Sequence, residues 1–422
     1  MYEKTAIIGY GKSGAGAERI LKLRGCGQPD LYDDANPCCK PIAEYKDIYE
    51  LTVVSPGVPF SKLPEKPSVY TSEIELAYGW MPADSKVIGI TGTNGKSTVT
   101  HLTAQILNNL GHNAISCGNI GYTFADAVAE IVEPAIFVVE LSSFQTELLQ
   151  DFSMQATAVT NITPDHLDRY ATVEDYVNAK LALLSFIDSE GVLIADPDVR
   201  ITNRVLKAVY KVRYMDREYR AWPKLAGNIM NFGNFYADIR KFELFGAHNL
   251  LNLAFALSLA DAVTPMEGDV TQYICGLTGL PHRTEVVPTD NGIRWINDSK
   301  ATNVDSTLTA LKSCVDPTIV FLGGRDKKGD FTQLTDELER CASVVCLFGE
   351  AAPIISSQLT NKLNRPVKIF RTLRNAVEEA VALAKPGCTV ILSPGCASYD
   401  EFLNYEDRGH KFAEYIKDAY NV

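Results

Sequence analysis

The chain contains at residues 87–98 the run Val87-Ile88-Gly89-Ile90-Thr91-Gly92-Thr93-Asn94-Gly95-Lys96-Ser97-Thr98. This run begins as an apolar, β-branched segment, turns at glycines and continues into an amphipathic stretch, which predicts a strand, a tight loop and a helix. Backbone N–H groups of such a loop can point at one anion, Lys96 adds a positive charge, and the Ser97 hydroxyl can reach Mg²⁺. We therefore predict a phosphate-binding loop for a nucleoside triphosphate.

The loop is a variant of the common G-x-x-x-x-G-K-[ST] pattern, because Ile90 stands six residues before Lys96. The alternative is a strand-to-helix turn that needs glycine only for its backbone. Gly-Lys-Ser at a helix start, directly after an apolar strand, favours the phosphate-binding interpretation over turn chemistry alone.

Composition limits the class of protein. The chain has 422 residues, 46% hydrophobic and 22% charged, which is enough for two or three domains with their own cores. The formal net charge of -12 argues against a nucleic-acid or anionic-membrane binder. Ten cysteines show no C-x-x-C pair, and no apolar run reaches the roughly 18 residues that span a bilayer. We expect a cytoplasmic, monomeric enzyme without membrane insertion.

The rest of the chain alternates between short apolar runs and helical patterns, which is typical of α/β domains with parallel sheets covered on both faces. A proline- and glycine-rich segment that ends near residue 82 separates a first α/β domain from the phosphate-loop strand. We expect strands over Thr5–Ile8, Asp30–Tyr32, Leu51–Val54, Ala135–Val139, Ala156–Thr160, Ile293–Ile296, Thr318–Leu322, Val344–Phe348, Val367–Phe370 and Thr389–Leu392. We expect helices over Ala17–Leu23, Lys96–Leu110, His248–Ala262 and Leu373–Ala384.

Residues directly after the strands are the first candidates for a site, because ligands of open parallel sheets gather at the carboxyl ends of strands. Glu140 closes one apolar strand and suits Mg²⁺, although a charge at a helix N-terminus without any ligand is the alternative. The charged segment 165–170 follows another strand and contains His166, which we interpret as functional rather than structural.

Lys180 is the least expected residue of a helix that begins at Thr172 with a capping-box partner at Asp175. It lies within an apolar stripe at helical spacing. Such a lysine must extend to solvent, pair with a carboxylate or lose its charge. A neutral amine can also react with carbon dioxide to give a carbamate, which is a metal ligand, but composition alone leaves these alternatives open. The stripe consists of Val173, Tyr176, Val177, Leu184 and Ile187.

Seven motifs, taken in order, resemble the Mur ligase family and extend over nearly the whole chain. The sixth and seventh favour the branch that adds D-glutamate, and the Asp-Asn-Pro-Arg signature of the diaminopimelate-adding branch is absent. The motifs are Gly92-Thr93-Asn94-Gly95-Lys96-Ser97-Thr98, Glu140-Leu141-Ser142-Ser143-Phe144-Gln145, Asn161-Ile162-Thr163-Pro164-Asp165-His166-Leu167-Asp168-Arg169-Tyr170, His248-Asn249, Gly279-Leu280-Pro281-His282-Arg283, Asn297-Asp298-Ser299-Lys300-Ala301-Thr302-Asn303 and Ser393-Pro394-Gly395-Cys396-Ala397-Ser398.

The resemblance implies three domains. These are a Rossmann-like UDP-binding domain over residues 1–82, a central P-loop ATPase domain with a mainly parallel sheet over 83–281, and a Rossmann-like, amino-acid-binding domain over 282–422. It also implies an ATP-dependent ligase that adds D-glutamate to UDP-N-acetylmuramoyl-L-alanine in peptidoglycan precursor synthesis. A carboxylate does not condense with an amine in water, so ATP would first convert it to an acyl phosphate.

The resemblance further implies a role for individual residues. Lys96, Glu140, His166 and Lys180 would be catalytic, with Ser97 and Glu140 at one Mg²⁺ and His166 and a carbamylated Lys180 at a second. Tyr405 stands where an aromatic residue, commonly Phe, lines the amino-acid pocket. The implied ATP-binding residues are Gly92, Thr93, Asn94, Gly95, Lys96, Ser97, Thr98, Asn249, Arg283 and Asp298; those for the UDP substrate are Lys12, Ser13, Asp33, Gly57 and Asn119; those for D-glutamate are Lys300, Thr302, Lys327, Ser398 and Tyr405.

Three rival functions remain. Gly9-x-Gly11-x-x-Gly14 with Asp33 about twenty residues on is a dinucleotide-binding fingerprint, which predicts an NAD-dependent oxidoreductase. That function leaves the phosphate loop, Glu140 and Lys180 unexplained. The other rivals are a P-loop nucleotide switch and a folylpolyglutamate-type ligase. Two segments depart from the family. Asp34-Ala35 replaces a Thr-Arg pair seen in some family members, so we expect different contacts to uracil or phosphate there. Residues 189–245 resemble the family poorly, and we assign no role to that segment.

Overall fold

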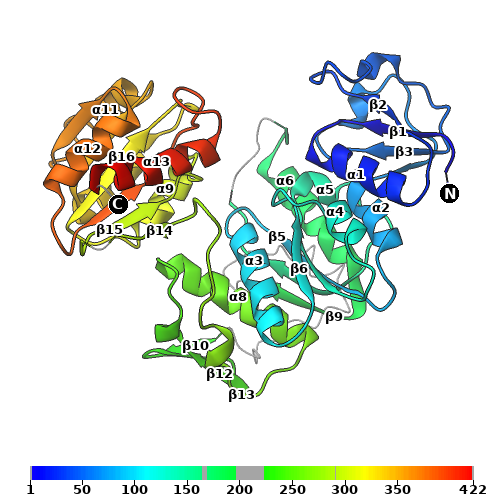
Figure 1. Cartoon of the computed structure of the whole chain (residues 1–422), viewed down its shortest axis with the longest axis horizontal. Coiled ribbons are helices and arrows are strands. Elements are labelled where there is room, and N and C mark those ends of the chain that lie inside the picture. Colours follow the sequence, from blue (N-terminus) through cyan, green and yellow to red (C-terminus); the bar gives the residue numbers. More distant parts are fainter. Residues whose placement is uncertain (1, 164–168, 196–222, 290, 421–422) are drawn as a thin grey trace. The chain divides into compact units, whose positions relative to one another are not determined.

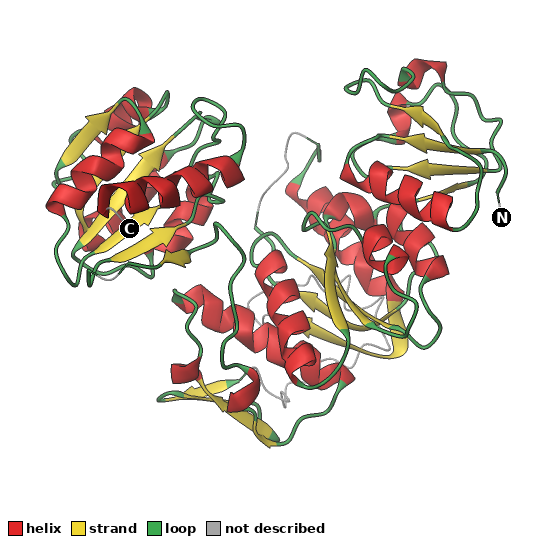
Figure 2. Cartoon of the chain, in the orientation of Figure 1, coloured by secondary structure: helices red, strands yellow, loops and turns green. Residues whose placement is uncertain are grey.

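The computed structural model describes residues 2–163, 169–195, 223–289 and 291–420. They fall into two compact units. Unit 1 comprises Met1–Phe242 and Asn252–Leu277, and unit 2 comprises Glu243–Leu251 and Thr278–Val422. Strands and helices alternate within both units (Figure 1, Figure 2). Within the described residues, no helix is long and apolar enough to cross a membrane.

Unit 1 begins with a parallel sheet of four strands in the order β2-β1-β3-β4. Side chains alternate between its faces, so that Ile7 packs on one side with helix α1 while Ala6 and Ile8 pack on the other with a cluster of tyrosines. The elements are β1 (Thr5–Ile8), α1 (Lys12–Leu23), β2 (Asp30–Tyr32), β3 (Leu51–Val54), β4 (Tyr70–Thr71) and α2 (Glu73–Trp80).

A second parallel sheet of unit 1 has five strands in the order β6-β7-β5-β8-β9. Strand β5 is central, with Ile90 opposite Glu140 of β7 and Thr91 opposite Val159 of β8. The carboxyl ends of β5, β7 and β8 therefore meet at one edge of the sheet. The elements are β5 (Lys86–Thr91), α3 (Lys96–Asn109), β6 (Ala114–Gly118), α4 (Phe124–Ala129), β7 (Ile136–Glu140), α5 (Ser143–Thr146), β8 (Met154–Val159), α6 (Val173–Leu181) and β9 (Ile187–Ala195).

One hydrophobic core joins these two sheets. Ile20 of α1, Ile74 of α2 and Phe124 of α4 belong to the same buried cluster as Phe137 of β7. All four side chains are at most 1% exposed. The segment near residue 82 therefore connects two sheets that share a core.

A small third sheet of unit 1 combines an antiparallel arrangement of β10, β11 and β12 with a short parallel strand, β13. It falls partly within the region to which sequence analysis assigned no role. The long apolar helix α8 (Ala247–Val263) follows β12, and the boundary between the units falls within this helix. The strands are β10 (Lys224–Ala226), β11 (Ile229–Asn231), β12 (Phe235–Asp238) and β13 (Gly268–Asp269).

Unit 2 contains a six-stranded sheet in the order β14-β15-β19-β16-β17-β18, parallel except for the pair β14 and β15. Alternate strand residues feed two cores. Val320 and Leu322 pack with α9, α10 and α11 on one face, while Ile319 and Phe321 pack with α12 and α13 on the other. The elements are β14 (Glu285–Val287), β15 (Arg294–Asn297), α9 (Val304–Leu311), β16 (Thr318–Gly323), α10 (Thr335–Cys341), β17 (Ala342–Phe348), α11 (Ala352–Leu359), β18 (Val367–Phe370), α12 (Leu373–Leu383), β19 (Thr389–Leu392) and α13 (Tyr405–Tyr420).

The structure confirms the α/β class with parallel sheets, and the predicted strands agree with the observed ones to within two residues at each end. One expectation was wrong. The apolar stripe around Lys180 does not lie on a single helix, because α6 ends at Leu181 and Ile187 begins strand β9. Val173 is 39% exposed and so is not on the buried face.

Candidate functional site

The predicted phosphate loop occupies the turn between β5 and α3. Gly92 has φ of 141°, and a Cβ there would lie 2.1 Å from Thr160 Oγ1. Only glycine fits this combination of backbone angle and close approach. The Thr93 N–H donates to the Asn161 carbonyl at 2.8 Å. The loop thus packs against the end of β8.

Thr160 and Asn161, which directly follow β8, hold the middle of the loop in place. Thr160 Oγ1 and Asn161 Nδ2 donate to the Asn94 carbonyl at 2.6 and 3.0 Å, and the Asn94 N–H donates to Asn161 Oδ1 at 2.9 Å. Sequence analysis gave neither Thr160 nor Asn161 a role. Their position directly after an apolar strand is the signal that identifies them.

Helix α3 presents its N-terminus to this loop. Gly95 is the N-cap and has no side chain with which to cap the helix, and the first turn contains no acidic residue. Lys96 Nζ donates to the Thr93 carbonyl at 2.8 Å, and Ser97 is 7% exposed. This arrangement of N–H groups, ammonium and hydroxyl can bind an anion, because the helix dipole adds to their charge.

Glu140 lies at the same edge of the sheet, at the end of β7. Its side chain is 2% exposed, and its Oε1 accepts from Asn119 Nδ2 at 3.1 Å. Its Oε2 is buried and has no hydrogen-bond partner among the described residues. A buried carboxylate oxygen without a donor is costly unless a cation satisfies it, so this residue fits the predicted Mg²⁺.

Lys180 reaches the phosphate loop from α6. The helix begins with the predicted capping box, in which Thr172 Oγ1 accepts from the Asp175 N–H at 3.1 Å and Asp175 Oδ2 accepts from the Thr172 N–H at 3.1 Å. Lys180 is 2% exposed, its Nζ donates to the Gly92 carbonyl at 2.7 Å, and the ammonium lies 4.8 Å from the Tyr176 ring centroid. The side chain therefore does not extend to solvent.

His166, the remaining predicted metal ligand, lies outside the described residues. Within the described ranges, no three or more His, Cys, Asp or Glu side chains gather into a cluster suited to a metal ion. A cation beside Glu140 would therefore need other ligands, and the Ser97 hydroxyl and the oxygens of a bound triphosphate have the right chemistry.

The predicted UDP-substrate residues surround the start of α1. Lys12 and Ser13 form its first turn after Gly11, and Asp33 accepts from the Tyr10 N–H at 2.6 Å. Lys12 Nζ lies 3.4 Å from the position that a Cβ on Gly121 would take, which brings it to the loop that carries Asn119. Asn119 thus connects this region to Glu140, and Gly57 lies in the turn after β3, whose Ser55 and Val58 approach Gly9.

The predicted ATP-binding residues of unit 2 meet around a turn with an unusual backbone. His282 and Thr284 both have positive φ, of 62° and 42°, and Arg283 lies between them. Asn249 Nδ2 donates to Thr284 Oγ1 at 3.4 Å, and Asp298 Oδ1 accepts from the Thr284 N–H at 3.1 Å. A non-glycine residue in this region costs energy, which surrounding contacts must offset.

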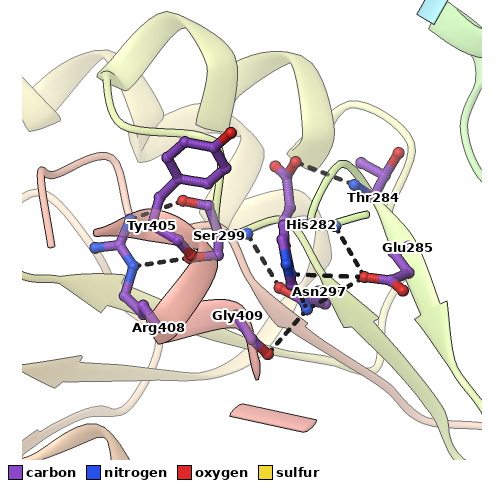
Figure 3. A network of polar contacts seen from close by, with 9 residues as sticks. His282, Thr284, Glu285, Asn297, Ser299, Tyr405, Arg408 and Gly409 are labelled. Carbon is purple, nitrogen blue, oxygen red and sulfur yellow. Dashed lines mark hydrogen bonds and ion pairs between the residues drawn. The ribbon is translucent and has the colours of Figure 1, made fainter. Parts of the chain in front are cut away.

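Asn297, at the end of β15, and Glu285 provide contacts to this turn (Figure 3). Its Nδ2 lies 3.0 Å from His282 Nδ1 and donates to the Gly409 carbonyl at 3.1 Å, and Glu285 Oε2 accepts from the His282 N–H at 2.8 Å. Burial lowers the pKa of His282 from its ordinary value. A neutral imidazole can accept from Asn297 through Nδ1, so this network holds the turn in place.

Burial raises the pKa of Asp298 to about 7, against the lowering effect of a hydrogen bond from Ser393. Ser393 Oγ donates to Asp298 Oδ2 at 2.7 Å. The carboxyl therefore has a fixed orientation through one donor on each oxygen.

The predicted D-glutamate residues follow three neighbouring strands of unit 2. Lys300 and Thr302 follow β15, Ser398 follows β19 and Lys327 follows β16, and β19 lies between the other two strands. Lys300 Nζ lies 3.6 Å from the ring centroid of Tyr405, the first residue of α13. The sheet thus gathers at one edge the residues that the family resemblance assigned to D-glutamate.

The sequence is similar to two family models and to named enzymes of other organisms. Residues 90–260 match the model of the Mur ligase middle domain, and residues 282–396 match that of the Mur ligase glutamate ligase domain. The UDP-N-acetylmuramoylalanine--D-glutamate ligase of Caldicellulosiruptor bescii is 33% identical over 447 residues, covering 99% of this chain and 98% of the relative. The enzyme of that name from Synechocystis sp. is 34% identical over 446 residues, covering 97% and 98%.

Solved structures share the fold. A UDP-N-acetylmuramate-alanine ligase from Thermotoga maritima has a TM-score of 0.60 at 14% identity and covers 99% of this chain and 100% of its own. A MurF ligase from the same organism, solved in complex with ADP, has a TM-score of 0.58 at 14% identity and covers 90% of each chain.

Proposed function

The chain belongs to the Mur ligase family and is an ATP-dependent ligase, and from this premise we propose that it joins D-glutamate to UDP-N-acetylmuramoyl-L-alanine. The name shared by relatives of about one-third identity over almost the whole chain supports this choice of substrates. The observation that carries the chemistry is that Lys180 donates to Gly92 of the phosphate loop, while Glu140 ends β7 at the same edge of the sheet, opposite Ile90 of β5. Activation of a carboxylate with ATP requires charge neutralisation at this place.

The reaction has two steps. An oxygen of the L-alanyl carboxylate attacks the γ-phosphorus of ATP, the bond to the β,γ-bridging oxygen breaks, and ADP leaves. The D-glutamate amine then attacks the carbonyl carbon of the acyl phosphate, a proton leaves the nitrogen, and inorganic phosphate departs as the amide forms. The loop N–H groups and Lys96 would orient the β- and γ-phosphates for the first step.

Ser97 and Glu140 would hold one Mg²⁺, and His166 and Lys180 would serve a second. Bound Mg²⁺ neutralises phosphate charge and polarises the phosphoryl oxygens. For this role Lys180 must become a carbamate. Its neutral amine attacks the carbon of CO₂, an N–C bond forms and a proton is released. Burial of the side chain supports this modification, because desolvation disfavours the ammonium form.

Other residues would bind the substrates. Asn249, Arg283 and Asp298 would contact ATP, and Lys300, Thr302, Lys327, Ser398 and Tyr405 would surround D-glutamate, whose two carboxylates match the cationic side chains. Lys12, Ser13, Asp33, Gly57 and Asn119 would bind the UDP moiety. We assign these functions to three domains, 1–82, 83–281 and 282–422, in a monomeric cytoplasmic enzyme.

Phosphate release tests the proposal. We expect release only when UDP-N-acetylmuramoyl-L-alanine, ATP, Mg²⁺ and D-glutamate are all present, with one amide formed per phosphate by mass spectrometry. L-glutamate serves as the matched control because it differs only in configuration. Equal turnover with L-glutamate, or phosphate release without the UDP substrate, would contradict the proposed function.

A further inference from the structure

Arg408 is a buried cation in the first part of α13, and sequence analysis gave it no role. Its side chain is 0% exposed. Its Nε donates to Ser299 Oγ at 2.9 Å, and its Nη2 donates to the Ser299 carbonyl at 2.7 Å. Its Nη1 donates to the carbonyls of Cys396 and Ala397 at 3.1 and 3.2 Å. Figure 3 shows the guanidinium beside Ser299.

All four acceptors in the described part of the chain are neutral oxygens. Burial of a guanidinium that donates to no carboxylate among the described residues is unfavourable, and the charges of Asp298 and Asp400 offset this only in part. An apolar side chain would avoid this desolvation, but it would leave the buried acceptors without a donor. Burial accordingly lowers the pKa of Arg408 to about 10. Because this value is well above 7, the guanidinium is still charged at neutral pH. What an apolar residue lacks is a rigid, planar set of donors that can bind several carbonyls at once.

The acceptors belong to two loops that carry predicted D-glutamate residues. Ser299 directly precedes Lys300, and Ala397 directly precedes Ser398. Ser299 Oγ also donates to the carbonyl of Tyr405 at 2.8 Å, which ties the first loop to the start of α13. One guanidinium therefore fixes the backbone beside three of the five predicted residues.

A third loop closes around the same group. Gly324, directly after β16, has φ of 124°, and a Cβ there would lie 3.0 Å from Arg408 Nη1 and 2.2 Å from the Ala397 carbonyl. The following residue, Arg325, exchanges two backbone hydrogen bonds with Ala397, at 2.8 and 3.0 Å. Lys327 lies two residues further along. A glycine at 324 thus leaves room for the guanidinium between the loops after β15, β16 and β19.

We propose that Arg408 is a positioning residue that sets the spacing of the three D-glutamate-binding loops. This inference rests on the proposed function. Arg408 does not touch the substrate, since it is buried and directs its donors to the backbone and to Ser299. It acts through Lys300, Ser398 and Tyr405. Asp298 depends on it less, because Thr284 and Ser393 hold that carboxyl independently.

The test is the steady-state kinetics of phosphate release, with each substrate varied in turn. We expect Arg408→Met to raise the KM for D-glutamate at least about tenfold, while the KM for ATP and for UDP-N-acetylmuramoyl-L-alanine changes less than about twofold. Arg408→Lys should give an intermediate KM, because lysine donates hydrogen bonds but cannot span the loops. Arg374→Met is the matched control. It removes a half-exposed arginine of α12 in the same unit and should leave all three KM values unchanged.

Ser299→Ala keeps the test decisive if Arg408→Met does not fold. It deletes one acceptor of Arg408 and the link to Tyr405, and it should raise the KM for D-glutamate about threefold with unchanged circular dichroism. Wild-type protein without D-glutamate-dependent release overturns both the function and this inference. Wild-type turnover combined with variants that alter all three KM values equally, or none, overturns the inference alone.

Discussion

Two buried cations, Lys180 in unit 1 and Arg408 in unit 2, have opposite surroundings. Lys180 is 2% exposed and contacts the Gly92 carbonyl and the face of Tyr176, directly beside the phosphate loop. Arg408 is 0% exposed and donates to four oxygens of two backbone loops. Both charges are removed from water, but one lies beside the predicted phosphate loop and the other lies between loops of unit 2.

The two surroundings reflect what each residue type contributes when it is buried. A lysine can release its proton, and the resulting amine is a nucleophile that can be modified. An arginine stays charged and offers a fixed fork of donors, so it suits a structural link. We therefore propose a catalytic role for Lys180 and a positioning role for Arg408, and four predictions test this difference.

The largest expected effect is on catalysis at Lys180. Lys180→Ala should lower kcat by about 1,000-fold, or about 4 kcal/mol of transition-state stabilisation, because the oxygens of the proposed carbamate would be lost. Added formate or acetate should restore part of the activity by supplying an oxygen ligand. Phosphate release with and without these acids measures the effect.

Further additives and variants distinguish whether Lys180 acts through its positive charge or through oxygen ligands. Methylamine should not rescue Lys180→Ala, and Lys180→Arg should stay inactive although it keeps the positive charge. Rescue by amines, or an active Lys180→Arg, would show that charge is what matters at this position and would remove the distinction from Arg408.

The next effect concerns Asp298 and the pH dependence of stability. Its pKa is about 7 in the folded protein against an ordinary value of 3.8, so between pH 4 and 7 the folded state holds a proton that the unfolded state releases. The free energy of unfolding therefore falls as pH rises through this window and is level above it, with a change on the order of 4 kcal/mol. Asp298→Asn should remove this part of the slope in urea unfolding.

Glu73 gives the counterpart in unit 1. Burial raises its pKa to about 7 as well, its Oε1 accepts from the Ala125 N–H at 2.6 Å, and the nearby charge of Asp126 raises the pKa further. Near Asp298, the charges of Arg283 and Arg408 act in the opposite direction. Arg408→Met should thus move the Asp298 transition to higher pH and leave that of Glu73 in place. A shift of both would mean that Arg408 affects stability generally.

Sequence patterns located the loop and helix starts of unit 1 better than the loop contacts of unit 2, for physical reasons. Glycines, Lys96 and Ser97 directly after a β-branched strand define a phosphate loop locally, and the capping box at Thr172 was predicted and confirmed. The contact between Lys180 and Gly92 joins residues 88 positions apart, which only the fold determines. Helical spacing also could not distinguish the end of α6 from the start of β9, so Ile187 was placed on the wrong element.

The role of Arg408 had no local signal at all. It lies in the polar segment Glu406-Asp407-Arg408-Gly409-His410-Lys411, and such a run of polar residues indicates an exposed part of a helix. Its burial results from three loops that meet at the edge of the unit 2 sheet, and Gly324 makes room for it. Such a convergence depends on sheet order, which alternation of apolar runs does not specify.

A third prediction compares the two cations by stability. Arg408→Met leaves several buried carbonyls without a donor and should lower the free energy of unfolding by about 3 kcal/mol. Lys180→Met removes a desolvated ammonium and keeps the apolar stem, so it should change stability by less than about 1 kcal/mol. Urea unfolding at pH 7 of both variants, with Arg374→Met as the control, measures the contrast. An equal loss of unfolding free energy in both variants would mean that Lys180, like Arg408, stabilises the fold.

The smallest effects concern the N-caps of the two helices that carry these cations. Thr172 caps α6, and Asn404 Oδ1 accepts from the Asp407 N–H at 2.7 Å at the start of α13. Thr172→Ala and Asn404→Ala should each cost about 1 kcal/mol of unfolding free energy, because each removes one N-cap. Their kinetic effects should nevertheless differ. Asn404→Ala should raise the KM for D-glutamate slightly, since the start of α13 carries Tyr405 and Arg408, while Thr172→Ala should lower kcat slightly and leave that KM unchanged. If both variants change the same kinetic parameter, α6 and α13 do not act on different steps of the reaction, and the proposed difference between Lys180 and Arg408 is wrong.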